Sequence, residues 1–131
     1  MVNYASLNEE CLIMRITVVR EEARTMFAQA TSIRVPVGGM VPMRRLIEQD
    51  YLPLLRQREG FVSAQLLEQV DDPEAALLIV MWDSQSAVEA FHRTGALQAS
   101  VSALSSRLPG VRVHRDSFTV TCLAEGALTK I

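Results

Sequence analysis

The side chains best able to do chemistry in this chain are two isolated histidines and a few polar residues around its single tryptophan. His114 stands in the run VRVHRDSF, where Arg112 and Asp116 alternate with it. Alternating residues of a strand share one face. If that face is turned toward helices, His114 brings a base of near-neutral pKa into the space between sheet and helices. If it is turned away, His114 is an edge-strand residue in solvent.

Trp82 is a second candidate, because it ends an apolar run just before a predicted helix. It either lines a ligand pocket at the strand end or is a core aromatic residue whose indole N–H donates to a carbonyl. Phe91 falls on the apolar side of the following helix, where it packs in the core or contacts a ligand. His92 is one position off that side, so we expect it in solvent.

Three more residues are candidate substrate contacts. Arg34, with Gln29 and Thr31 nearby on the same predicted strand, could bind an anionic or phenolic group, or Arg34 could simply stand at the exposed strand end. Tyr51 precedes Pro53, which lies inside a helical pattern and removes a backbone donor there. We therefore expect a kink at Pro53, with Tyr51 at the mouth of the pocket.

The composition narrows the class of protein. The chain has 131 residues, 49% of them hydrophobic, which suits one domain with its own core. Its net charge is −2 and it has no Lys/Arg-rich run, so we expect no nucleic-acid partner. No apolar run reaches membrane-spanning length and the N-terminus does not resemble a secretory signal, which predicts a cytoplasmic protein without a membrane partner.

Metal and cofactor motifs are missing from the sequence. Neither histidine has a second His or Cys at ligand spacing, and we expect no metal and no cofactor. Cys11 and Cys122 are far apart and not part of a motif, so we expect two buried thiols in a reducing compartment.

The order of predicted elements gives the fold class. Strands are predicted within residues 26–39, 61–70, 77–82 and 111–123, and helices within residues 40–60 and 83–108. Gly95 should interrupt the second helix, and Ser86 with Glu89 has the spacing of a capping box, Asp83 or Ser84 being the alternative cap. This β-α-β-β-α-β order predicts an α+β, ferredoxin-like antiparallel sheet with two helices on one face.

The strand at residues 77–82, LLIVMW, has no polar residue. A sheet with one wet face should alternate apolar and polar side chains, so both faces of this strand should be covered. The helices account for one face. We expect a second copy of the chain to cover the other, which predicts a homodimer packed sheet to sheet, a dimeric α/β barrel.

The element order, the REGF turn, the unit EQVDDPEAALLIVMWDSQSAVEAF and the LPGV before the last strand resemble the antibiotic biosynthesis monooxygenase family. The resemblance covers roughly residues 24–123. It divides the chain into an N-terminal extension of residues 1–23, which could form an extra strand or arm, the domain at 24–123 and a C-terminal tail at 124–131. It implies a small hydrophobic or aromatic ligand.

The resemblance also shows departures. The aromatic-polyketide monooxygenases carry Asn, Tyr and Arg where this chain has Leu78, Val88 and about Ser102, so only Trp82 is shared. The haem-degrading branch has Asn, Trp and a His ligand where this chain has about Thr31, Phe91 and about Val101, which disfavours haem.

Two functions follow from these observations. One is a cofactor-independent monooxygenase acting on an electron-rich aromatic or quinol-type molecule, with His114 and Trp82 as catalytic residues and Thr31, Arg34, Tyr51 and Phe91 as substrate contacts. The alternative is a non-catalytic small-molecule-binding or stress-related dimer of the same fold.

Overall fold

The structure is a computed structural model that describes residues 26–126. The predicted extension at residues 1–23 and most of the tail lie outside the described residues. The elements follow in the order β1 (Phe27–Arg34), α2 (Met40–Leu46), η1 (Ile47–Tyr51), α3 (Leu52–Arg56), β2 (Phe61–Glu68), β3 (Ala75–Trp82), α4 (Gln85–Arg93), α5 (Ala96–Arg107) and β4 (Arg112–Thr119).

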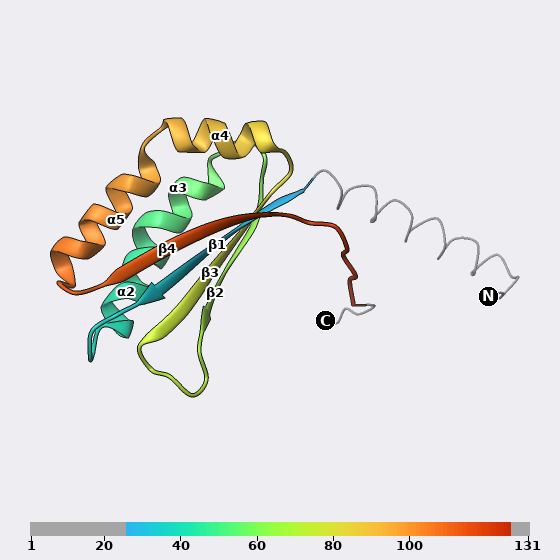
Figure 1. The fold of residues 1–131 in the computed structure, drawn as a ribbon. Helices are drawn as coiled ribbons and strands as arrows, with labels where there is room; N and C mark the ends of the chain where they lie inside the picture. Colours follow the sequence, from blue (N-terminus) through green and yellow to red (C-terminus); the bar gives the residue numbers. More distant parts are fainter. Residues whose placement is uncertain (1–25, 127–131) are drawn as a thin grey trace, which may run out of the picture.

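The strands form one antiparallel sheet in the order β2-β3-β1-β4, and the helices lie over one of its faces (Figure 1). This confirms the predicted α+β, ferredoxin-like fold. The last strand is shorter than predicted, because it ends at Thr119 rather than continuing through Leu123.

The two faces of the sheet differ in burial. Along β3, Leu78, Val80 and Trp82 face the helices and are at most 3% exposed. The side chains between them, including Ile79 and Met81, face the other way and are half-buried. Within residues 26–126 no helix covers that second face, so only half of the predicted double burial is accounted for inside the described part of the chain.

The first helical segment is irregular where Pro53 predicted a kink. Residues Ile47–Tyr51 form a π-helical turn between α2 and α3. Pro53 has no N–H to donate to the carbonyl one turn back, so the α-helical hydrogen-bond ladder cannot pass through it unchanged. The wider turn places Tyr51, 5% exposed, against the core.

The second helical segment divides at Gly95, as predicted. Gly95 has a left-handed backbone with φ 74°, which separates α4 from α5. The N-cap of α4 is Ser84, whose hydroxyl accepts from the N–H of Ala87 at 3.1 Å. The prediction of a capping box from Ser86 to Glu89 is therefore wrong, and the alternative prediction of Ser84 as the N-cap is confirmed.

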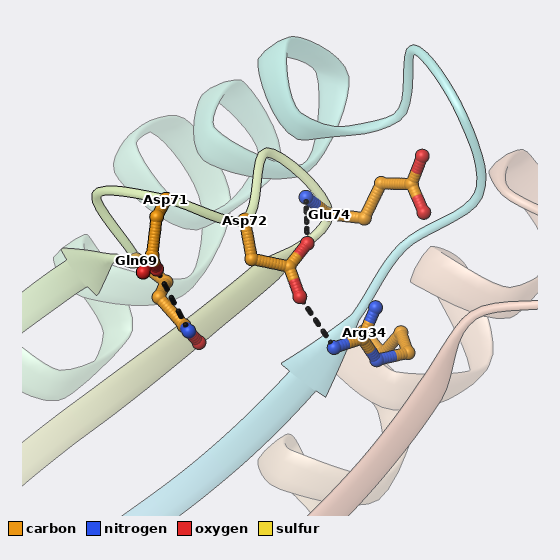
Figure 2. Close-up of polar contacts among 5 residues, drawn as sticks. All are labelled: Arg34, Gln69, Asp71, Asp72 and Glu74. Carbon is orange, nitrogen blue, oxygen red and sulfur yellow. Dashed lines mark hydrogen bonds and ion pairs between the residues drawn. The ribbon is translucent and has the colours of Figure 1, made fainter.

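The β2–β3 turn is held by Asp72 (Figure 2). One carboxylate oxygen accepts from the N–H of Glu74 at 3.1 Å, and the other accepts from Nη2 of Arg34 at 2.7 Å. The Arg34 hydrogen bond is the main reason that the pKa of Asp72 is lowered. This ion pair fixes the turn to the end of β1.

Candidate functional site

Aromatic side chains fill the end of the space between sheet and helices. Trp82 and Phe91 are 0% and 1% exposed, with ring centroids 5.3 Å apart. Phe61 meets Trp82 edge-on at 6.0 Å, and Tyr51 meets Phe91 at 6.1 Å. The cluster joins the end of β3 to η1 and α4. It brings together three of the predicted site residues, Trp82, Phe91 and Tyr51.

Gln29 of β1 is buried beside this cluster at 4% exposure. Its Oε1 accepts the indole N–H of Trp82 at 3.0 Å. Because an indole nitrogen can only donate, this bond fixes which end of the amide faces Trp82. The Gln29 amide nitrogen must then point away from the indole.

That amide nitrogen faces His92 of α4, with 3.4 Å between the two Nε2 atoms. The amide nitrogen is a donor, so Nε2 of His92 must be the acceptor and its ring proton must be on Nδ1. Burial, and then the positive charge of Arg115, lower the pKa of His92 from its ordinary value of 6.5. The arrangement therefore favours a neutral imidazole whose tautomer is set by Trp82 through Gln29.

His92 and Gln29 line a hollow of about 320 Å³ between α4 and the adjoining strands. Its walls are Phe27, Ala28, Gln29, Gln85, Val88, Glu89, His92, Ser117, Phe118 and Thr119. The hollow is open to solvent at the rim, and a planar ring could lie there with an oxygen toward Gln29 and His92. Glu89 and His92 are the ionisable groups of its wall.

A second cavity, of about 40 Å³ and called the inner cavity below, lies between the sheet and α5. Thr31, 6% exposed, and Tyr51 supply polar groups to a lining that is otherwise mostly aliphatic. Burial raises the pKa of Tyr51 to about 12. The cavity is large enough for a water molecule but not for an aromatic ring, so it admits a ring only if neighbouring side chains move.

His114 does not face the space between the sheet and the helices, so it cannot act there as a base. In the β1–β4 register it pairs with Ser32, on the face opposite the buried Thr31 and Ile33. Its side chain is 74% exposed, with Nε2 3.2 Å from the carboxylate of Asp116. Of the two orientations considered for His114, the structure shows the solvent-exposed one, because the phase of β4 directs Arg115 toward the helices instead.

Arg34 is likewise remote from the aromatic cluster. Its side chain is 49% exposed and pairs with Asp72 in the turn. Together with Arg112 and His114 it lines a depression on the sheet face opposite the helices. The structure thus brings Thr31, Tyr51, Trp82 and Phe91 to the helix side and leaves Arg34 and His114 on the other.

His92 and Arg115 were not predicted as site residues, and Gln29 was expected only as a neighbour of Arg34. A helical position one step off the apolar side indicated solvent for His92, and it is indeed exposed, yet it still reaches Gln29. For Arg115 the sequence gives conflicting signals, because the apolar residues Val113 and Phe118 fall on opposite faces of the strand.

Three other expectations concern a buried thiol, a metal site and a membrane span. Cys122 is exposed, which corrects the prediction of a buried thiol, because it follows the end of β4 rather than lying within it. Among residues 26–126, no three His, Cys, Asp or Glu side chains are grouped as metal ligands would be. No helix in the same part of the chain is long and apolar enough to cross a membrane.

The fold and the enclosed aromatic surface define a small α+β domain of the ferredoxin-like class with a site between sheet and helices. The model of the antibiotic biosynthesis monooxygenase family matches residues 11–103. The chain therefore belongs to this family, as the sequence resemblance predicted. No curated protein matches the sequence closely enough to count as a relative.

Solved structures share the fold at low sequence identity. The cofactor-independent oxygenase SnoaB from Streptomyces nogalater is 16% identical with a TM-score of 0.62, over 81% of this chain and 99% of that one. The monooxygenase of the gene ActVA-Orf6 from Streptomyces coelicolor, in complex with nanaomycin D, is 22% identical with a TM-score of 0.62, over 85% and 97%. A conserved protein from Methanosarcina mazei has a TM-score of 0.64 at 11% identity, over 75% and 95%.

Proposed function

We propose that this protein is a monooxygenase that needs no metal or flavin and oxidises an electron-rich aromatic molecule, such as a phenol or quinol. The observation that supports this most is the hydrogen-bond chain from Trp82 through Gln29 to His92. It holds a neutral imidazole at a hollow next to buried aromatic rings, which is what removal of a phenolic proton requires.

The substrate hydroxyl would replace the long contact between Gln29 and His92. It would donate to Nε2 of His92, and the amide N–H of Gln29 would donate to the same oxygen. A simple phenol has a pKa of about 10 and imidazole about 6.5, so the transfer is uphill by about 5 kcal/mol for an ordinary imidazole and by more for His92, whose pKa is lowered. A hydrogen bond to a charged group contributes about 1.5–3 kcal/mol, so Gln29 meets part of that gap. The rest falls to the acidity of the substrate, which favours a phenol more acidic than the unsubstituted compound.

The oxidation itself would be carried by the substrate. The anion gives one electron to O₂, the resulting radical and superoxide form a C–O bond, and the peroxide loses water. For a phenol with a free ring position the balance is HO–Ar–H + O₂ → O=Ar=O + H₂O. The proton removed by His92 leaves with the water, and one atom of O₂ remains in the product. The protein supplies the base and the hydrogen bond to the anion.

We propose further that the protein is a homodimer joined through the open sheet face. Ile79 and Met81 are apolar, half-buried side chains on a face that no described helix covers. Leu67 and Phe118 on the same face are 46% and 53% exposed. An isologous contact would bury both copies of this surface at once.

The alternative is a non-catalytic dimer that binds a small molecule. The observation that favours it is the inner cavity, whose volume of about 40 Å³ leaves no room for a ring. The aliphatic Leu78, 3% exposed, also stands where the polyketide monooxygenases carry an Asn. In this case the outer hollow would hold a ligand that leaves unchanged.

Oxygen uptake with a panel of aromatic quinols separates the two functions. The protein is treated with a chelator first, and uptake is compared with the uncatalysed rate. We expect His92→Ala to lower turnover by about 10²-fold, the usual contribution of a general base. His114→Ala, on the opposite face, tests the assignment made from sequence. A loss confined to His114→Ala would contradict the role given to His92, and no uptake with any quinol would favour the binding protein.

A further inference from the structure

The inner cavity lies where α5 presents a short side chain to the sheet. Leu97, Ser100, Val101 and Leu104 recur at helical spacing along one side of α5, and all four line the cavity. Ser100 is the smallest of them. Because a serine side chain is shorter than that of Leu or Val, the space between α5 and the sheet is left unfilled at this position.

The surface of the inner cavity is apolar. It is formed almost entirely by carbon atoms, although Thr31, Tyr51 and Ser100 are among the lining residues. The other described residues that line it are all Ile, Leu or Val. A water molecule in a protein cavity is typically held by about three hydrogen bonds, which a carbon surface does not offer. The inner cavity therefore favours a small apolar molecule over water.

The size of the cavity limits that molecule. Its volume of about 40 Å³ is roughly three times the 10–15 Å³ that one water requires on the same measure. This is room for a diatomic molecule and not for an aromatic ring. Three lining residues of α5, Leu97, Ser100 and Val101, are only half-buried. A small molecule can therefore enter on the side of α5.

The inner cavity adjoins the outer hollow, the one lined by Gln29 and His92. Thr31 lines the cavity and Gln29 lines the hollow, two residues apart on the same face of β1, which is about 7 Å along a strand. Tyr51 of the cavity wall meets Phe91, the residue before His92, at 6.1 Å between ring centroids. The two spaces have no described lining residue in common, so a ring in the hollow would leave the cavity free.

We propose that the inner cavity is the binding site for O₂ and that the organic substrate occupies the outer hollow. The proposal rests on the proposed function, which requires O₂ as the second substrate. O₂ is diatomic and apolar, so it matches both the volume and the surface of the cavity. Two sites also solve a problem of access, because a ring that covers the hollow does not close the entry at α5.

Paramagnetic O₂ can locate its own site, since it accelerates the relaxation of nearby nuclei. The spectrum of methyl-labelled protein is recorded under O₂ and under N₂ at the same pressure. The methyl groups of Leu78 and Leu104 line the cavity, whereas those of Val35 and Leu55 are equally buried elsewhere in the core. O₂ should accelerate the relaxation of the first pair at least about threefold more than that of the second, because an apolar cavity concentrates an apolar gas. Equal acceleration in both pairs would overturn the proposal.

Filling the cavity tests whether the site serves the reaction. Ser100→Leu should abolish the extra relaxation and raise the KM for O₂ at least about threefold, with kcat at saturating O₂ unchanged. Ser106→Leu, at an exposed position of the same helix, is the matched control and should behave like the parent. An unchanged KM for O₂ in folded Ser100→Leu would overturn the role in the reaction. The relaxation of the parent decides the proposal even if Ser100→Leu does not fold.

The two proposals fail in different ways. Oxygen uptake on a quinol without preferential relaxation at Leu78 and Leu104 would keep the monooxygenase and remove the O₂ site. Preferential relaxation without uptake on any quinol would remove the monooxygenase, and the cavity would then be an apolar gas site without a role in oxidation.

Discussion

Replacing Gln29 by Leu tests whether the hydrogen bond to Trp82 is a buried structural contact. Leu fills similar space but cannot accept a hydrogen bond from the indole N–H of Trp82. The side chains of Gln29 and Trp82 are both at most 4% exposed, so water cannot replace the lost acceptor. A buried donor left without a partner costs about 1–3 kcal/mol. For a domain of this size, 1 kcal/mol lowers the Tm by roughly 4–8 °C. We therefore expect Gln29→Leu to lower the Tm by at least about 4 °C in thermal unfolding followed by circular dichroism.

A double-mutant cycle isolates the bond from the change of shape. Trp82→Phe removes the donor, so Gln29→Leu should cost less in the Trp82→Phe background than in the parent. Gln98→Leu, at an exposed position of α5, is the matched control and should leave the Tm almost unchanged. Equal costs of Gln29→Leu in both backgrounds would refute the reasoning, since the 3.0 Å contact would then contribute nothing measurable.

Two further predictions concern the open face and a tight turn. Ile79→Lys should convert the dimer to a folded monomer in sedimentation at micromolar concentration. Burial of an Ile side chain contributes about 1.5–3 kcal/mol, whereas burial of an unpaired Lys charge in the interface costs free energy. A parent protein that already sediments as a stable monomer would contradict the dimer. Gly60→Ala should unfold at much lower denaturant concentration than Gly110→Ala. Both glycines have positive φ, but a Cβ added at Gly60 would lie 2.4 Å from the Cβ of Ala87. A Cβ added at Gly110 would have no such neighbour within 4 Å. Equal midpoints for the two variants would show that the turn at Gly60 relaxes.

The fold was predictable from sequence because its signals are local. The periodicity of apolar residues predicts the strands and helices. Pro53 predicts the irregular turn in the first helical segment, and Gly95 predicts the division of the second. The ion pair of Arg34 with Asp72 was not predictable, because it joins residues 38 positions apart.

The site was less predictable because it depends on the phase of one strand. In β4 both alternating sets contain polar residues, so hydrophobicity does not decide which set faces the helices. A catalytic role for His114 required that His114 face the helices, which would have placed Arg115 on the other face. The pairing of Thr31 with Arg115 settles the phase, and that register is a long-range property. Gln29 was overlooked for a similar reason, since its partner Trp82 is 53 positions away.

The pH dependence of kcat/KM for oxygen uptake, which reports the pKa values of the free enzyme, tests the central claim most directly when it is measured for the parent and for Gln29→Leu. His92 acts as a base only when neutral, so activity should rise with pH, and its apparent pKa should lie below 6.5 because burial and Arg115 disfavour the imidazolium. The Gln29 N–H stabilises the neutral ring, so Gln29→Leu should move that apparent pKa upward. Glu89 lines the same hollow, and Glu89→Gln serves as the control for its charge. A rate in the parent that does not change between pH 5 and 8, or an apparent pKa that is the same with and without Gln29, would contradict a neutral His92 positioned by Trp82 and Gln29.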